Sequence, residues 1–253
     1  AEEVAKLTPI VKESVEQIRN GLPEGAKKLA PLLDTDPGAN LAGLQRAIQR
    51  ARASVNDLDV AKSTFFSFVD PAGLVLRSES DPDLAANKSI FAVFPALAKA
   101  VEPNAGTVEV FGEMEELRGV RTGRDLQWVV AHAVKGDAAV VKGLFVTGWS
   151  MRRYAFFLEE AAKRSLIAIA ERDATKKVPV VYVFAVKSGK TYGAPVTPDV
   201  NAEAIDALDV IGKTTSGPYR GTLEITGRVF GVAAQRTPEL GDDAAVVVLL
   251  SEL

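Results

Sequence analysis

The residues best suited to chemistry gather between positions 118 and 132. Trp128 and His132 are four residues apart in "DLQWVVAHAVK", so a strand there would place both side chains on one face. Directly upstream, "ELRGVRTGRD" supplies Arg118, Arg121 and Arg124. An aromatic wall beside guanidinium groups suits the binding of a small anion in a cavity. The alternative is that the tryptophan belongs to the core and the arginines lie on the surface.

Ser150 could be a nucleophile, because "TGWSM" joins an apolar stretch to a helical one, as in the hydrolase elbow. However, Arg152 stands where that motif needs glycine. The single histidine, His132, also precedes the serine, whereas that fold places it afterwards. Ser150 is better explained as the N-cap of a helix that begins at Met151. The sequence therefore predicts a protein that is not an enzyme, with a hydrolase using Ser150 as the alternative.

Phosphate and metal sites are not predicted. "SGKT" at 188–191 and "GKTT" at 212–215 carry Phe184 and Ala207 where a phosphate-binding loop needs its first glycine. The chain has no cysteine and one histidine, and its acidic stretches lack the spacing of a calcium loop. We therefore expect no cofactor and no metal.

The bulk composition is that of a globular protein. The chain has 253 residues, 47% of them apolar and 25% charged, which is enough for two domains. Its net charge of -3 lacks the clustered basic excess of a nucleic-acid surface. No apolar run approaches the roughly 18 residues needed to span a bilayer. Any membrane attachment is therefore expected through segments outside this chain.

Residues 2–20 have the pattern of an amphipathic helix, with apolar residues at helical spacing between Glu and Lys. This apolar stripe consists of Val4, Leu7, Val11, Val15 and Ile18. It approximates a heptad seam, which suits a homodimer, and the alternative is that it packs on the chain's own modules. "GLPEG" predicts an interruption, and a second helix follows between Leu41 and Leu58.

The segment "TFFSFVDPAGLVLRS", residues 64–78, predicts a β-hairpin. Pro71 has the preset φ that suits a turn, and Gly73 can adopt the positive φ of a tight reversal. Three more strand-like stretches follow, at 107–112, 125–135 and 139–149, and a long amphipathic helix covers 148–174.

The second half repeats this plan at smaller size. "VPVVYVFAVKSGKTYGAP" reads as another strand, turn and strand, and the pentapeptide DAAVV occurs at 137–141 and again at 243–247. Together these features indicate an internal duplication. The predicted fold is α/β, of the α+β kind: a long N-terminal helix followed by two modules with antiparallel sheets, at 1–150 and 151–253.

This order of parts resembles the double Cache domains, the PAS-like extracytoplasmic sensor modules of bacterial chemoreceptors and sensor kinases. The most specific feature is the strand that ends Asp-Pro-x-Gly and resumes as "LVLRS". The resemblance implies two PAS-like modules, a periplasmic location, and a small molecule bound in the membrane-distal module at 1–150. Membrane spans would flank the segment. A cytoplasmic PAS-type interaction module is the remaining alternative.

The ligand expected from this resemblance depends on the pocket residues. Amino-acid-binding members carry a pattern of tyrosine, arginine, tryptophan, tyrosine and aspartate that has no match in this chain. The charge of the segment from Arg118 to Arg124 instead favours a small carboxylate. The predicted ligand-binding residues are Trp128, His132, Arg118, Arg121 and Arg124.

Overall fold

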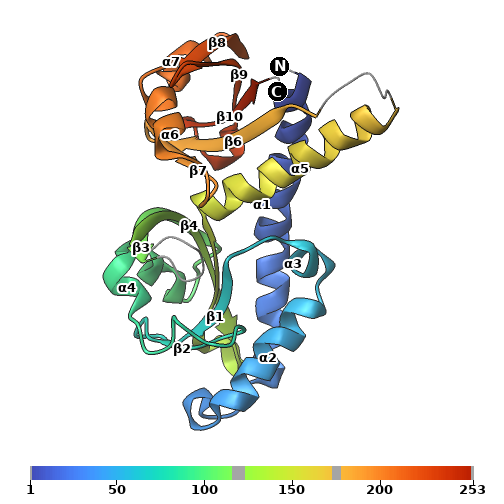
Figure 1. Ribbon diagram of the computed structural model, residues 1–253. Coiled ribbons are helices and arrows are strands. Elements are labelled where there is room, and N and C mark those ends of the chain that lie inside the picture. The colour runs from blue at the N-terminus through green and yellow to red at the C-terminus, as the bar shows by residue number, and fades with distance from the viewer. Residues whose placement is uncertain (1, 116–122, 173–177, 252–253) are drawn as a thin grey trace. The chain divides into compact units, whose positions relative to one another are not determined.

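The computed structural model describes residues 2–115, 123–172 and 178–251, and the chain divides into two compact units. We call residues 16–150 the first module, and residues 1–15 with 151–253 the second module (Figure 1). The sequence-based division placed the whole first helix in the first module. In the structure, the first 15 residues belong to the second module instead.

The first helix, α1 (Glu2–Leu29), is longer than the sequence indicated. It continues through "GLPEG", because Leu22, Ala26 and Leu29 extend the buried apolar stripe beyond the proline. At Gly25 a Cβ atom would lie 2.5 Å from Leu58 Cδ1, so the glycine permits close packing. Tertiary packing here outweighs the local helix-breaking signal.

The apolar stripe of α1 is buried within the chain. Its residues are at most 1% exposed: Val4, Leu7, Val11, Val15 and Ile18. Since the stripe packs on the chain's own modules, it does not offer the seam expected for a homodimer.

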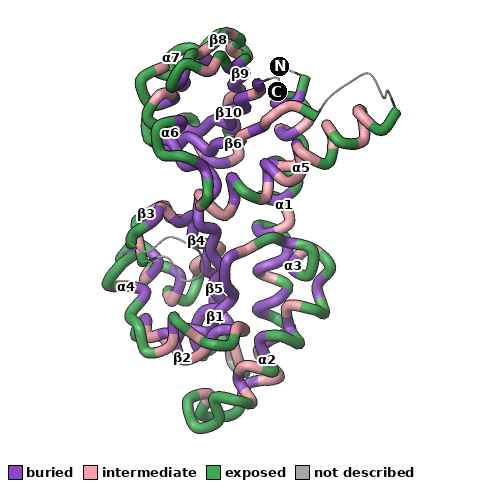
Figure 2. The backbone as a smooth tube through the Cα atoms, in the orientation of Figure 1, coloured by how far each residue is buried: buried purple, intermediate pink, exposed green. Residues whose placement is uncertain are grey.

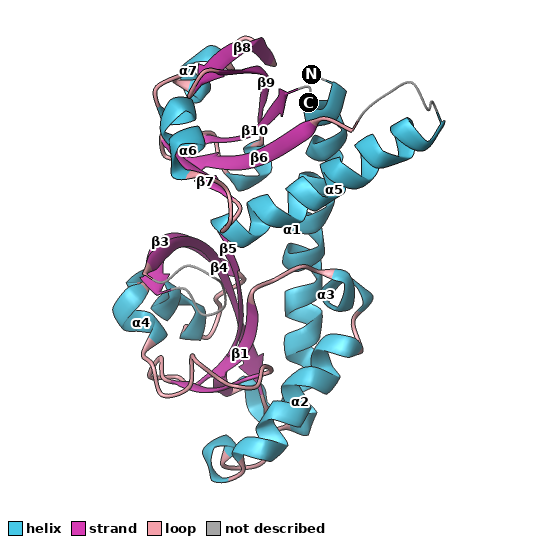
Figure 3. Cartoon of the chain, in the orientation of Figure 1, coloured by secondary structure: helices cyan, strands magenta, loops and turns pink. Residues whose placement is uncertain are grey.

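The first module contains one antiparallel sheet in the order β2-β1-β5-β4-β3. Helices flank the sheet (Figure 3). Its strands are β1 (Phe65–Val69), β2 (Val75–Ser78), β3 (Val108–Glu115), β4 (Arg124–Lys135) and β5 (Val141–Ser150). Its α-helices, besides part of α1, are α2 (Leu41–Ala53), α3 (Asn56–Val60) and α4 (Ile90–Val93), and a 3-10 helix, η3, covers Pro95–Val101.

The second module repeats this topology, with the order β7-β6-β10-β9-β8. Its strands are β6 (Val180–Lys187), β7 (Lys190–Gly193), β8 (Tyr219–Ile225), β9 (Arg228–Arg236) and β10 (Ala244–Ser251). Its α-helices are α5 (Met151–Arg172), α6 (Asp199–Asp206) and α7 (Val210–Lys213). The predicted fold of two antiparallel modules is confirmed, and β8 is a strand that the sequence pattern did not indicate.

The repeated pentapeptide is not the structural basis of the duplication. Val141 begins β5, whereas its counterpart Val247 lies inside β10, paired with Phe184. The DAAVV copies are therefore out of register with each other. The equivalence of the modules rests on their strand order.

The central strands of the first sheet, β1, β4 and β5, are buried on both faces (Figure 2). One face, which includes Trp128 and Phe145, packs near α1, as the contacts of Arg19 and Gly25 show. The opposite face contributes Val129 to a core cluster with α4 and η3. This second face forms the floor of the candidate site.

Candidate functional site

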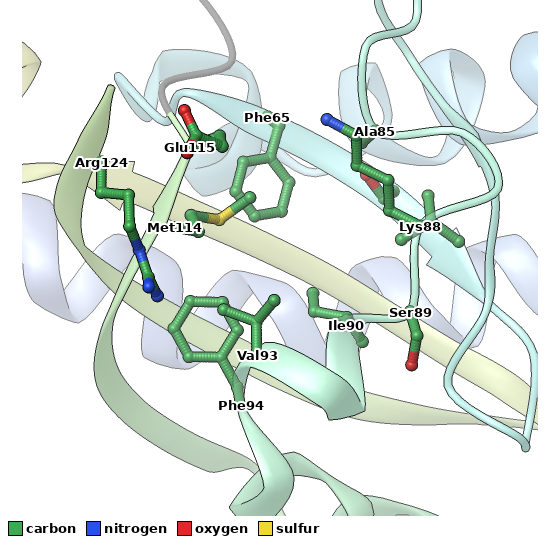
Figure 4. A pocket seen from close by; sticks show the side chains of 12 residues that line it. Phe65, Ala85, Lys88, Ser89, Ile90, Val93, Phe94, Met114, Glu115 and Arg124 are labelled. Carbon is green, nitrogen blue, oxygen red and sulfur yellow. The ribbon is translucent and has the colours of Figure 1, made fainter. Parts of the chain in front are cut away.

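A cavity of about 360 Å³ lies in the first module, between the sheet and α4 (Figure 4). Apolar side chains dominate its lining, and polar groups are few. The lining residues are Phe65, Ser67, Val75, Ala85, Lys88, Ser89, Ile90, Val93, Phe94, Met114, Glu115 and Arg124. A concave, largely apolar space with a few polar groups is typical of a small-molecule site.

The hairpin between β1 and β2 supplies one wall. Asp70 Oδ1 accepts hydrogen bonds from the backbone N–H groups of Ala72 (2.9 Å) and Leu74 (2.8 Å), which fixes the turn. Gly73 adopts a φ of 90°, and a Cβ atom there would lie 2.3 Å from the ring of Phe91. The turn therefore needs glycine, both for its backbone conformation and for the approach of the α4 segment.

The loop after β2 supplies a second wall, and Asp83 orders it. One carboxylate oxygen of Asp83 accepts from the N–H groups of Ala85 and Ala86, both at 3.1 Å, and the other accepts from Ser78 N–H at 2.6 Å. Ser89 then caps α4, its hydroxyl accepting from Ala92 N–H at 3.2 Å. These bonds hold the loop and α4 against the sheet.

Among the described residues, the charged groups that line the cavity are Arg124, Glu115 and Lys88. Arg124 and Glu115 face each other across β4 and β3, and Arg124 also donates to the backbone oxygen of Glu113. With two cationic side chains and one carboxylate, this described part of the lining carries a net positive charge. The cavity can therefore receive a molecule with an apolar body and an anionic group.

The expected placement of Trp128 on the cavity wall is wrong. Its indole N–H donates to Glu109 Oε2 at 3.2 Å, its ring lies 4.8 Å from that of Trp149, and the Arg19 guanidinium lies 5.9 Å above it. This is the α1 face of the sheet. Both faces of β4 are apolar, so the pattern alone did not show which of them lines the cavity.

His132 also lies away from the cavity, on the face of β4 that carries Trp128. Its Nδ1 is 3.1 Å from the Thr107 hydroxyl. Burial, followed by the charges of Lys135 and Lys27, lowers the pKa of His132 below its usual value. Of the three predicted arginines, Arg124 lines the cavity, whereas Arg118 and Arg121 lie outside the described residues.

Ser150 lacks the histidine base that a hydrolase would need. Its side chain is fully buried, and its hydroxyl donates to Asp125 Oδ2. Ser150 pairs with Gln127 across the sheet, whereas His132 pairs with Phe145. The two candidates are thus separated by five residues of strand, or about 16 Å.

Comparison with known proteins gives matches among solved structures. Neither protein-family models nor curated protein sequences match this chain. A domain of a sensory box/GGDEF family protein from Vibrio parahaemolyticus matches 99% of this chain and 94% of its own, with a TM-score of 0.60 at 12% identity. The ligand-binding domain of the Campylobacter jejuni chemoreceptor Tlp3, in complex with 4-methylisoleucine, matches 99% of this chain and 91% of its own. Its TM-score is 0.50 at 11% identity. The ligand-binding domain of the Pseudomonas aeruginosa amino acid chemoreceptor PctB, in complex with L-Gln, matches 100% of this chain and 90% of its own. Its TM-score is 0.50 at 13% identity.

The chain has the double Cache fold. Its whole length takes part in the likeness, so the two-module architecture is shared and not just one sheet. At such low identity the likeness concerns fold alone. The chemistry of this chain must therefore be argued from its own residues.

Most of the cavity was missed by sequence reasoning. Phe65 and Val75 come from the predicted hairpin, and Ile90 and Phe94 from the short helical stretch after it. Apolar residues that line a cavity have the same pattern as core residues, so periodicity does not distinguish them. The one usable signal was the positive charge that precedes β4.

Within the part of the chain that the structure describes, no group of His, Asp and Glu side chains could hold a metal ion. No described helix combines the length and apolarity needed to cross a membrane.

Proposed function

We propose that this chain is the extracytoplasmic ligand-sensing domain of a membrane-anchored bacterial receptor, either a chemoreceptor or a sensor kinase. In this proposal its first-module cavity binds a small carboxylate in the periplasm. The observation that carries the proposal is the apolar cavity with Arg124 at its edge, in a fold shared with ligand-binding domains of chemoreceptors.

The residues suggest how such a ligand would be held. Phe65, Ile90 and Phe94 would cover an apolar body, and Arg124 would form a charge-assisted hydrogen bond with the carboxylate. Such bonds contribute about 1.5–3 kcal/mol to binding. Burial of the apolar body adds further binding free energy but does not depend on the ligand's orientation. Binding would transmit a signal because the ligand stabilises one arrangement of the module over others.

The test uses two probes that differ in charge, hexanoate and hexanamide. At about a hundredfold excess over its Kd, hexanoate should stabilise the protein by roughly 2.7 kcal/mol, which is a shift of several degrees in Tm. Hexanamide should shift Tm less. Equal shifts with both probes would show that the carboxylate assignment is wrong.

Arg124→Gln should weaken hexanoate binding about tenfold or more, because the charged partner is lost. Arg220→Gln is the matched control, since Arg220 is likewise an exposed arginine on a strand, in the second module. It should leave the rise in Tm produced by hexanoate unchanged.

The proposed periplasmic location has its own test. Hydrophobic spans encoded on both sides of this segment in the full gene would agree with it, and their absence would favour the cytoplasmic interaction module.

A further inference from the structure

Gln127 carries the clearest unexplained polar group near the cavity. It is 1% exposed, and among the residues that the structure describes neither its amide oxygen nor its amide nitrogen has a hydrogen-bond partner. Buried polar groups are nearly always paired, and an unpaired buried amide costs stability, so this residue calls for a functional or structural explanation.

The register places Gln127 on the cavity side of the sheet. It alternates with Trp128 and shares its face with Val129, which belongs to the core cluster that includes Phe65 and Phe94. Across the sheet it is paired with Gly112 on β3 and Ser150 on β5, both small residues. Small neighbours leave space above the amide.

The ring of Phe94 fills that space. A Cβ atom at Gly112 would lie 2.7 Å from Phe94 Cε1, so the ring lies on the glycine and beside its cross-strand partner Gln127. Phe94 is also a lining residue of the cavity (Figure 4). One aromatic ring therefore lies between the cavity and the part of the sheet that holds the unpaired amide.

We infer that Gln127 is a specificity-determining residue that hydrogen-bonds a polar group of the ligand once the Phe94 ring moves aside. This inference rests on the proposed function. Arg124 and Gln127 are three residues apart on β4, so their Cα atoms lie about 10 Å apart. Strand alternation assigns them to opposite faces, but Arg124 is the first residue of the strand and its side chain lines the cavity. The ligand class is then a carboxylate whose far end carries a hydroxyl or amide group, joined by an apolar spacer.

The experiment compares hexanoate with 6-hydroxyhexanoate, which differs from it by one terminal hydroxyl. Wild-type protein should bind the hydroxylated probe at least tenfold more tightly, because only that probe pairs the buried amide. Gln127→Met, which keeps the side-chain length, should abolish or reverse this preference. The unliganded variant should melt at or above the wild-type Tm, since an unpaired polar group is removed.

Several results of this experiment would overturn the role of Gln127. Equal affinity of the wild type for both probes would overturn the role of Gln127 and leave the proposed function standing. A clear fall in the Tm of unliganded Gln127→Met would also overturn it, because the amide would then be paired in the folded protein, for instance by a buried water. If neither probe binds, the carboxylate assignment and this inference are both wrong. Gln235→Met makes the same change in the second module and should leave the preference intact.

Discussion

The ring of Phe94 occupies the space that a side chain at Gly112 would fill, with only 2.7 Å between Phe94 Cε1 and the position of such a Cβ atom. This contact places an aromatic ring at the wall of the cavity in the unliganded protein. Gly112→Ala should push the ring into the cavity and destabilise the protein by about 1–3 kcal/mol. It should also weaken hexanoate binding.

The measurement for this variant is a denaturant titration with and without hexanoate. Gly106→Ala is the control, because nothing lies within 4 Å of a Cβ atom at that position. If Gly112→Ala binds hexanoate with wild-type affinity, then Phe94 does not bound the ligand site.

Trp128→Phe should lower stability without affecting the ligand. The substitution removes the hydrogen bond to Glu109 and part of the contact with Trp149, at a cost of about 1–3 kcal/mol. Because the indole lies on the α1 face, the rise in Tm produced by hexanoate should persist. If hexanoate did not raise the Tm of this variant, Trp128 would belong to the ligand site after all.

The sequence was sufficient for the architecture but not for the cavity. Turn chemistry at Pro71 and Gly73, together with apolar alternation, predicted the hairpin and most strands. The same alternation could not decide the orientation of β4, because a sheet covered on both faces gives apolar residues at odd and even positions alike. Gln127 was a visible polar exception on one face, and only the register of the neighbouring strands shows what lies beside it.

The predicted end of α1 at "GLPEG" was wrong for a related reason, because the helix continues to Leu29. "GLPEG" carries a local helix-breaking signal, and the compensation comes from Leu58 and Phe145, which are distant in sequence. Local patterns do not contain such contacts. The position of Arg124 at the cavity agrees with the sequence, because a charge at the start of a strand can be read directly, whereas the apolar residues that line the cavity with it could not be recognised.

His132 should make stability depend on pH. Its pKa is lowered in the folded state relative to about 6.5 in an unfolded chain, so the unfolded state binds more protons between these values. The free energy of unfolding should be at its full value above about pH 6.5 and should fall as the pH drops toward the folded pKa. Below the folded pKa this contribution becomes constant.

The check is a comparison of the wild type with His132→Gln, whose Tm values are measured between pH 7.5 and 5. The variant should lose less stability over this range than the wild type does. If Tm depended on pH in the same way in both proteins, the pKa of His132 would not be lowered in the folded state.

The central claim, that the first-module cavity holds the ligand, is tested most directly by filling it. Val93 lines the cavity and is 40% exposed, whereas Val200 on α6 in the second module is 39% exposed, so the pair offers matched sites for tryptophan. Isothermal titration with hexanoate should show binding to the wild type and to Val200→Trp, and a loss of at least tenfold in affinity for Val93→Trp. Wild-type affinity in Val93→Trp, or a loss of binding in Val200→Trp alone, would contradict the account.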